Sequence, residues 1–72
     1  MVKATYTYSF NELSGKPKRF LEKQEECKIM GYGVTTDTVT LIVLFETNST
    51  FQTLKKELKS KFNLTEDKST IV

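Results

Sequence analysis

The chain has 72 residues, of which 38% are hydrophobic and 28% are charged, and its net charge is +2. A chain of this length forms one domain with a thin core, since a domain of about 60 residues buries only about 60% of the surface that its unfolded chain exposes. An aromatic content of 11% excludes an intrinsically disordered chain. The weak positive charge, carried by ten lysines and one arginine, is far from the strongly basic balance of a dedicated nucleic-acid-binding domain.

Cysteine content and the N-terminal sequence bear on the compartment. Cys27 is the only cysteine, whereas small secreted domains usually depend on two or more disulfides. Residues 1–6 lack the apolar segment of a signal peptide, and no apolar run is long enough to span a membrane. We therefore expect a cytoplasmic protein. The preference for lysine over arginine is typical of an A+T-rich genome, such as that of a low-G+C bacterium, its phage or a mobile element.

The first third of the chain predicts a strand, a loop and a helix. Apolar and polar side chains alternate from Val2 to Phe10, which indicates a strand with one dry face. Residues 11–16 contain Asn, Ser and Gly and predict a loop. Because proline is tolerated in the first turn of a helix, we expect a helix from Pro17 to about Glu26.

Two further strands are predicted next, joined by a tight turn at Thr36 and Asp37. In the first, Cys27 to Thr35, strict alternation would place Met30, Tyr32 and Val34 on one face and Cys27, Ile29, Gly31 and Gly33 on the other. The second, Thr38 to Phe45, contains the unbroken apolar run Leu41 to Phe45, which is typical of a strand covered on both faces. An alternative interpretation continues the first helix to Met30, which leaves the order β-α-β-α-β.

The last third predicts an amphipathic helix and a short strand. Ser49-Thr50-Phe51-Gln52 matches a capping box, and an apolar stripe follows at helical spacing, formed by Phe51, Leu54, Leu58 and Phe62. Asn63 suits a left-handed cap position, from which Leu64 can fold back on the stripe. Residues 69–72 are long enough only for a short edge strand.

The predicted order is therefore β-α-β-β-α-β. With right-handed crossovers this order gives an α+β, ferredoxin-like arrangement, in which one antiparallel sheet carries two helices on one face. The first and third strands would be the two central ones, and the fourth would lie at an edge.

The residue types present argue against catalysis. The chain has no histidine, which removes the commonest general base and most zinc sites, and a single cysteine cannot form a Cys-x-x-Cys pair. Glu22, Glu25 and Glu26 lie among lysines and are interpreted as solvated. We expect a protein that is not an enzyme and that binds no metal and no cofactor.

The leading functional hypothesis is a small protein-interaction module. If the helices cover the face that bears Val39, Leu41, Val43 and Phe45, then Ile42 and Leu44 lie on the open face next to Thr40. Apolar groups on an open face commonly mark association, either with a protein partner or with a second copy in a homodimer. We predict an interface at Thr40, Ile42 and Leu44.

The alternative hypothesis is weak binding of single-stranded nucleic acid. RNA-recognition domains share this element order and stack bases on aromatic side chains of the first and third strands. Here Tyr6 and Tyr8 would stack on bases if they faced outward, with Lys3 and Lys28 nearby, and lysines of the second helix would contact phosphate: Lys55, Lys56 and Lys59. If the tyrosines instead face the helices, they belong to the core.

Overall fold

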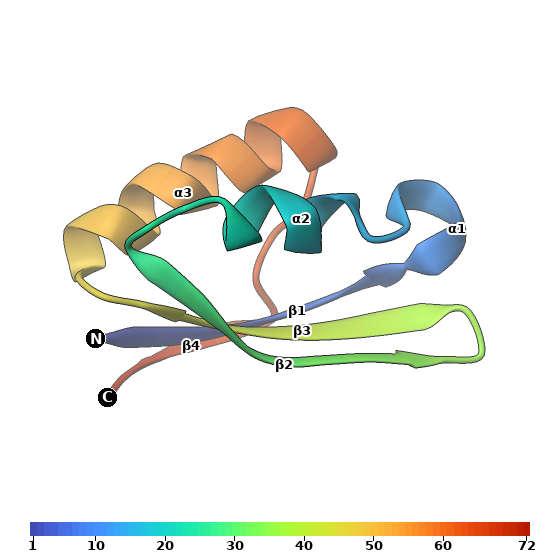
Figure 1. Ribbon diagram of the computed structural model, residues 1–72, viewed down its shortest axis with the longest axis horizontal. Helices are drawn as coiled ribbons and strands as arrows, with labels where there is room; N and C mark the ends of the chain where they lie inside the picture. Colours follow the sequence, from blue (N-terminus) through green and yellow to red (C-terminus); the bar gives the residue numbers. More distant parts are fainter.

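The computed structural model describes residues 1–72 and has an α+β architecture, with one antiparallel sheet of four strands and all helices on one face of it (Figure 1). The elements in chain order are β1 (Val2–Ser9), α1 (Phe10–Leu13), α2 (Lys16–Glu22), β2 (Cys27–Thr35), β3 (Thr38–Phe45), α3 (Asn48–Phe62) and β4 (Lys68–Ile71).

The sheet has the strand order β2-β3-β1-β4, so the first and third strands are the inner ones, as the sequence predicts. β1 pairs with β3 along its whole length, from Val2 opposite Phe45 to Ser9 opposite Thr38. β2 and β3 form the expected hairpin around Thr36 and Asp37. The alternative with a longer first helix is wrong, because residues 27–30 are part of a strand.

The core lies between the sheet and the helices. It is a cluster of 13 buried side chains, eight of which come from the two inner strands: Val2, Ala4, Tyr6, Tyr8, Val39, Leu41, Val43 and Phe45. The helices contribute Leu21 from α2 and the stripe of α3, where the Phe51 ring packs at 5.2 Å from the ring of Phe45. One face of the sheet therefore supplies most of the buried apolar surface, the main favourable term in folding.

The expectation that β3 is covered on both faces is wrong. Its alternation is strict, with Val39, Leu41, Val43 and Phe45 buried and the intervening residues only half-buried or exposed. Because every helix lies on one side of the sheet, nothing covers the other side of β3. Ile42 is half-buried because its side chain lies over Gly31, where an added Cβ would meet Ile42 Cδ1 at 3.3 Å.

The predicted faces of β2 are also wrong, because a β-bulge interrupts the alternation. Ile29 pairs with Val43 but Gly31 pairs with Ile42, so Met30 is an extra residue. Residues directly opposite each other in an antiparallel sheet share a face, and a bulge sets two residues against one. Cys27, Ile29, Tyr32 and Val34 therefore all lie on the helix side.

The first helical region differs from the prediction at both ends. Residues expected to form a loop contain the short helix α1, which is anchored where the Phe10 N–H donates to the Asp37 carbonyl at 2.7 Å. α2 ends at Glu22 rather than Glu26, because the next residues must descend to the sheet. Glu26 belongs to the connection between α2 and β2, since its carbonyl accepts a hydrogen bond from the Glu46 N–H at 2.9 Å.

The N-cap of helix α3 lies two residues before Ser49, which is the N-cap of the predicted capping box. The N-cap is Thr47, in extended conformation, and its Oγ1 accepts from the Thr50 N–H at 3.1 Å. The Thr50 hydroxyl in turn donates to Glu26 Oε2 at 2.6 Å, which ties the helix start to the α2–β2 connection.

The end of α3 and the last strand agree with the prediction. Asn63 adopts the left-handed conformation, with φ 54° and ψ 37°. The following Leu64 is buried in the core and its N–H donates to the Leu58 carbonyl. β4 forms a short edge strand against β1, where Val2 lies opposite Ile71.

Replacing Thr47 by alanine should lower the free energy of unfolding by about 1 kcal/mol, because the Thr50 N–H loses its acceptor. Ser49→Ala is the matched control and should change stability by less than about 0.5 kcal/mol, since Ser49 is exposed and makes no cap bond. Urea unfolding monitored by circular dichroism measures both. Equal losses for the two variants would contradict the assignment of the cap.

Candidate functional site

The sheet face without helices, termed the open face, is left uncovered by the fold (Figure 1). Its side chains follow from the strand register and from the bulge. They are Lys3, Thr5, Thr7 and Ser9 of β1, Lys28, Met30, Gly31, Gly33 and Thr35 of β2, Thr38, Thr40, Ile42 and Leu44 of β3, and Lys68 and Thr70 of β4. Nine of these 15 residues are therefore glycine, serine or threonine.

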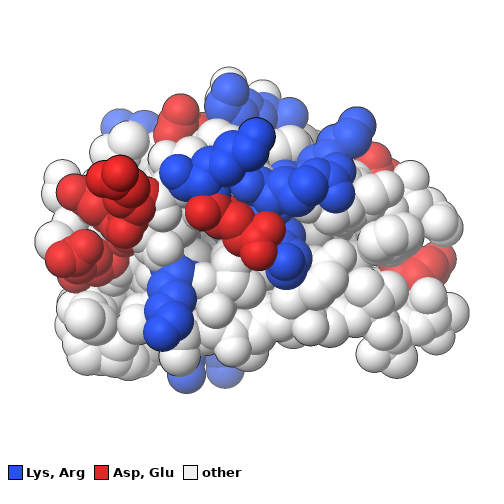
Figure 2. Space-filling model, in the orientation of Figure 1, with Lys and Arg blue, Asp and Glu red and all other residues white.

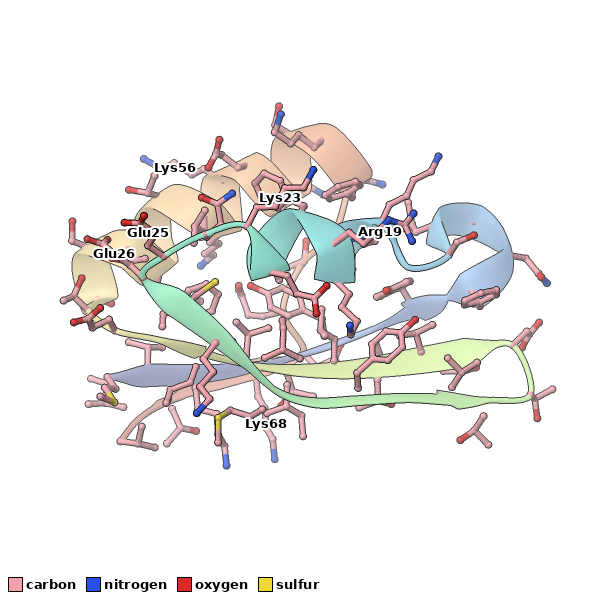
Figure 3. All side chains as sticks on the ribbon, viewed as in Figure 1. Arg19, Lys23, Glu25, Glu26, Lys56 and Lys68 are labelled. Atoms are coloured by element: carbon pink, nitrogen blue, oxygen red, sulfur yellow. The ribbon has the colours of Figure 1, made fainter.

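The other six residues are apolar or basic, and we call them the lysine-framed patch: Met30, Ile42 and Leu44 with Lys3, Lys28 and Lys68. Leu44 lies between Lys28 on β2 and Lys3 on β1, because both residues pair with it across the sheet. Lys68 pairs with Thr5, which pairs in turn with Ile42. Figure 3 shows Lys68 on the helix-free side of the sheet.

The charges of this patch are not neutralised within the chain. Its three lysines are exposed and make no ion pair; the two ion pairs of the molecule join Lys18 to Glu22 and Lys55 to Glu66. The carboxylate bound to the open face is that of Asp67, which accepts from the Thr7 hydroxyl beyond the patch. The patch can thus supply both apolar contact and positive charge.

A small hollow of about 200 Å³ opens at the margin of this patch. Leu44, Cys27 and Met1 supply its apolar lining, and its charged lining consists of Lys28 and the carboxylates of Glu25, Glu26 and Glu46. Burial raises the pKa of the Cys27 thiol, whose Sγ donates to the Leu21 carbonyl, so this thiol is held in its neutral form. The hollow is the size of a side chain and offers a contact for an apolar group.

The predicted interface residues lie together on this face, as the sequence indicates. Thr40 is exposed, and Ile42 and Leu44 are half-buried between neighbouring strands. Sequence reasoning missed Lys68 and Met30. The alternation of β1 and β3 cannot reveal them, because Lys68 is brought to this face by the pairing of a short edge strand, and Met30 lies on β2, where the bulge moves Tyr32 and Val34 to the other face.

The tyrosines predicted to stack on bases are core residues instead, which corrects that part of the nucleic-acid hypothesis. Tyr6 is fully buried and Tyr8 is 8% exposed, both under the helices. The Tyr8 hydroxyl donates to the Ser14 carbonyl at 3.1 Å, whereas the Tyr6 hydroxyl is buried without a hydrogen-bond partner. Neither ring can reach a base.

The lysines predicted to contact phosphate lie on α3, on the opposite side of the molecule from the open face. Lys55 is engaged with Glu66 at 3.3 Å, and its Nζ lies 5.6 Å from the centre of the Phe51 ring. Lys59 donates to Asn63 Oδ1 at 2.8 Å. Lys56 is exposed and points away from the sheet (Figure 3). The structure does not bring these lysines and the tyrosines to one surface.

A second, polar hollow of about 500 Å³ lies between the α2–β2 connection and the first half of α3. Carboxylates of Glu25, Glu26 and Glu57 line it, and Figure 2 shows acidic side chains gathered at this end of the molecule. Glu26 is held by the Thr50 hydroxyl, so it serves the joint between the two segments. Neither these glutamates nor any other set of three His, Cys, Asp or Glu side chains is arranged so that it could hold a metal ion.

A scan against protein-family models, a search of curated proteins and a search of solved structures each found no match. No helix of the structure combines the length and the apolar character that crossing a membrane requires. The open face must therefore be interpreted from its own chemistry.

Replacing Tyr6 and Tyr8 individually by phenylalanine should distinguish the contributions of their two hydroxyls to stability. Tyr8→Phe should lower the free energy of unfolding by about 1 kcal/mol, because the buried hydrogen bond to Ser14 is lost. Tyr6→Phe should leave stability unchanged or raise it, because the hydroxyl that it removes is buried without a partner. Urea unfolding of the two variants tests this, and a larger loss for Tyr6→Phe would contradict the assignment.

Stability should also fall in alkaline solution. Burial raises the pKa of Tyr8 from its usual value of 10.0 to about 12, and burial together with the charge of Glu66 raises the pKa of Tyr6 further. Below pH 10 both states keep these protons. Above it the unfolded chain ionises first, so the free energy of unfolding falls.

Urea unfolding between about pH 9 and pH 11 measures this loss. The double variant Tyr6→Phe with Tyr8→Phe should lose less stability over the same range, since lysine titration is common to both proteins. Parallel curves would show that the tyrosines do not contribute.

Proposed function

We propose that this protein is a small, non-catalytic interaction module that binds an acidic segment of another protein through the lysine-framed patch. The observation that carries the proposal is the pairing of Leu44 with Lys28 on one side and Lys3 on the other, on a face that no helix covers. Such a patch favours a partner that offers an apolar side chain between carboxylates.

The apolar part of the patch supports contact with a protein. Met30 is 54% exposed, and Ile42 and Leu44 are only half-buried. Burying such apolar side chains away from water is favourable, so a partner that covers them gains binding free energy. Exposed apolar groups rimmed by polar residues commonly mark interaction sites. The hollow beside Leu44 gives one partner side chain a place to insert.

The charges support a partner other than a second copy on this face. A face-to-face dimer would bring Lys3, Lys28 and Lys68 of both copies into one interface, where like charges are costly. The phosphates of a nucleic acid would be attracted to the lysines, but the open face carries no aromatic side chain on which bases could stack. An acidic protein segment with apolar side chains can contact both the aliphatic and the basic residues of the patch.

For the architecture, we propose a ferredoxin-like fold. The inner position of β1 and β3, the antiparallel pairing throughout and the helix on each crossover support it. The short helix α1 is then an addition to the first crossover. The single cysteine supports a reducing, cytoplasmic location.

Amide NMR of the ¹⁵N-labelled protein, titrated with a synthetic peptide that alternates leucine and aspartate, tests the binding proposal. Amide shifts should concentrate at residues 3–5, 28–31 and 42–44 and weaken as salt rises. Ile42→Thr with Leu44→Thr should weaken binding by about tenfold or more, because the apolar contact is lost while β-branched threonine still suits a strand.

Two controls make the test specific. Ile71→Thr removes an exposed apolar side chain from β4, outside the patch, and should leave binding unchanged. A peptide that alternates leucine and lysine should not bind. Shifts with a mixed single-stranded oligonucleotide and none with the acidic peptide would replace the proposal with nucleic-acid binding, and no shifts with either would refute it.

A further inference from the structure

One edge of the sheet is long and unprotected. β2 has nine residues and pairs only with β3, so the backbone N–H and C=O groups on its outer side have no partner in the chain (Figure 1). Such an edge is a template for pairing with another strand. The opposite edge, β4, has four residues and carries Lys68, so it is the poorer template.

The side chains of β2 lack the usual protection of an edge. No charged residue occurs from Ile29 to Thr36, and three large apolar side chains are exposed: Met30 at 54%, Tyr32 at 37% and Val34 at 46%. Natural edge strands are commonly blocked by charges, proline or bulges. Here the bulge at Met30 and the exposed Lys28 are such features, and both precede residues 31–35, which pair regularly with β3.

We propose that β2 pairs with β2 of a second copy of this chain, antiparallel and about a two-fold axis at Gly33. Residues directly opposite each other in an antiparallel pair share a face. A two-fold axis normal to the sheet must therefore lie midway between one residue and the same residue of the other copy. Centring on Gly33 sets Gly31 opposite Thr35 on the open face and Tyr32 opposite Val34 on the helix side. Each copy thereby covers the exposed Tyr32 and Val34 of the other.

The bulge and the flanking charges favour this register. Centring on Tyr32 would set Met30 opposite Val34, which lie on different faces because of the bulge. Antiparallel pairing also brings Lys28, near the start of β2, toward the end of the other β2, where Asp37 follows in the turn. Opposite charges therefore meet at both ends of an uncharged paired segment, and an aromatic and a β-branched side chain meet across it, a stabilising combination.

The dimer leaves the open face of each copy uncovered, and only Lys28 of the lysine-framed patch lies near the second copy. A two-fold axis normal to the sheet keeps both open faces on the same side, so the product is one continuous sheet of two copies with two patches exposed side by side. Dimerisation through β2 thus makes the module bivalent, which raises its avidity for a partner with repeated acidic segments. The pairing does not depend on the proposed function, because residues 31–35 make the paired contact, and Lys28, the one lysine of the patch near the second copy, lies beyond them.

Analytical ultracentrifugation and amide hydrogen exchange over a range of protein concentrations test the pairing. The wild type should show a concentration-dependent dimer, with protection of outward-facing amides within residues 31–35 only at high concentration. Val34→Lys should raise the dimer dissociation constant by about tenfold or more, because it sets a charge against Tyr32 of the other copy. Ile71→Lys is the matched control: it puts the same charge at an exposed position of the other edge and should leave the dimer intact.

Several outcomes would overturn the proposal. They are a wild type that is monomeric at every concentration, a dimer lost with Ile71→Lys but not with Val34→Lys, and a dimer lost only with Ile42→Thr and Leu44→Thr. If Val34→Lys fails to fold by circular dichroism, Thr35→Lys tests the same contact from the open face, opposite Gly31 of the second copy. Peptide binding by a monomeric wild type would separate this failure from that of the proposed function.

Discussion

The pairing of β1 with β3 is the interaction on which the rest of the structure depends. Eight residues of each strand lie in unbroken register, and this places four buried side chains of one beside four of the other on a single face. That face alone supplies eight of the 13 core residues, so the helices have one place to pack and the core of this small domain is one-sided. A thin core of this kind leaves the opposite face of the sheet in water.

The one-sided core explains the distribution of the chemistry. Tyr6 and Tyr8, the aromatic residues that the sequence suggests for base stacking, are buried in the core. Lys55 pairs with Glu66, and Lys59 bonds Asn63 at the end of α3. Exposed side chains without partners remain on the uncovered face and along the free β2 edge. Binding through the lysine-framed patch and dimerisation through β2 would use these two surfaces, with only Lys28 near both, so one module could hold a partner and a second copy at the same time.

Much of the fold is predictable because it follows from local periodicity. The alternation of Val2 to Ser9 and of Thr38 to Phe45 identifies both inner strands and their buried faces, and the spacing of Phe51, Leu54 and Leu58 identifies the buried stripe of α3. Asn63 marks the helix end by its own conformational preference. The errors arise where tertiary contacts accompany the departure from a local signal: Thr47 caps α3 in place of Ser49 while Thr50 binds Glu26, and Glu26 itself pairs through its backbone with Glu46.

The sequence by itself therefore determined the order of the four strands and of the two longer helices, the two inner strands and the position of Ile42 and Leu44 on the uncovered face, because a period of two or of 3.6 residues is a property of the chain alone. Only the tertiary structure decided which side chains join them there. Lys68 reaches the patch through the pairing of β4 with β1, and the bulge separates Met30 from Tyr32 and Val34, with which strict alternation grouped it. Both depend on how distant segments align, and strand register is fixed by the whole sheet rather than by any one strand.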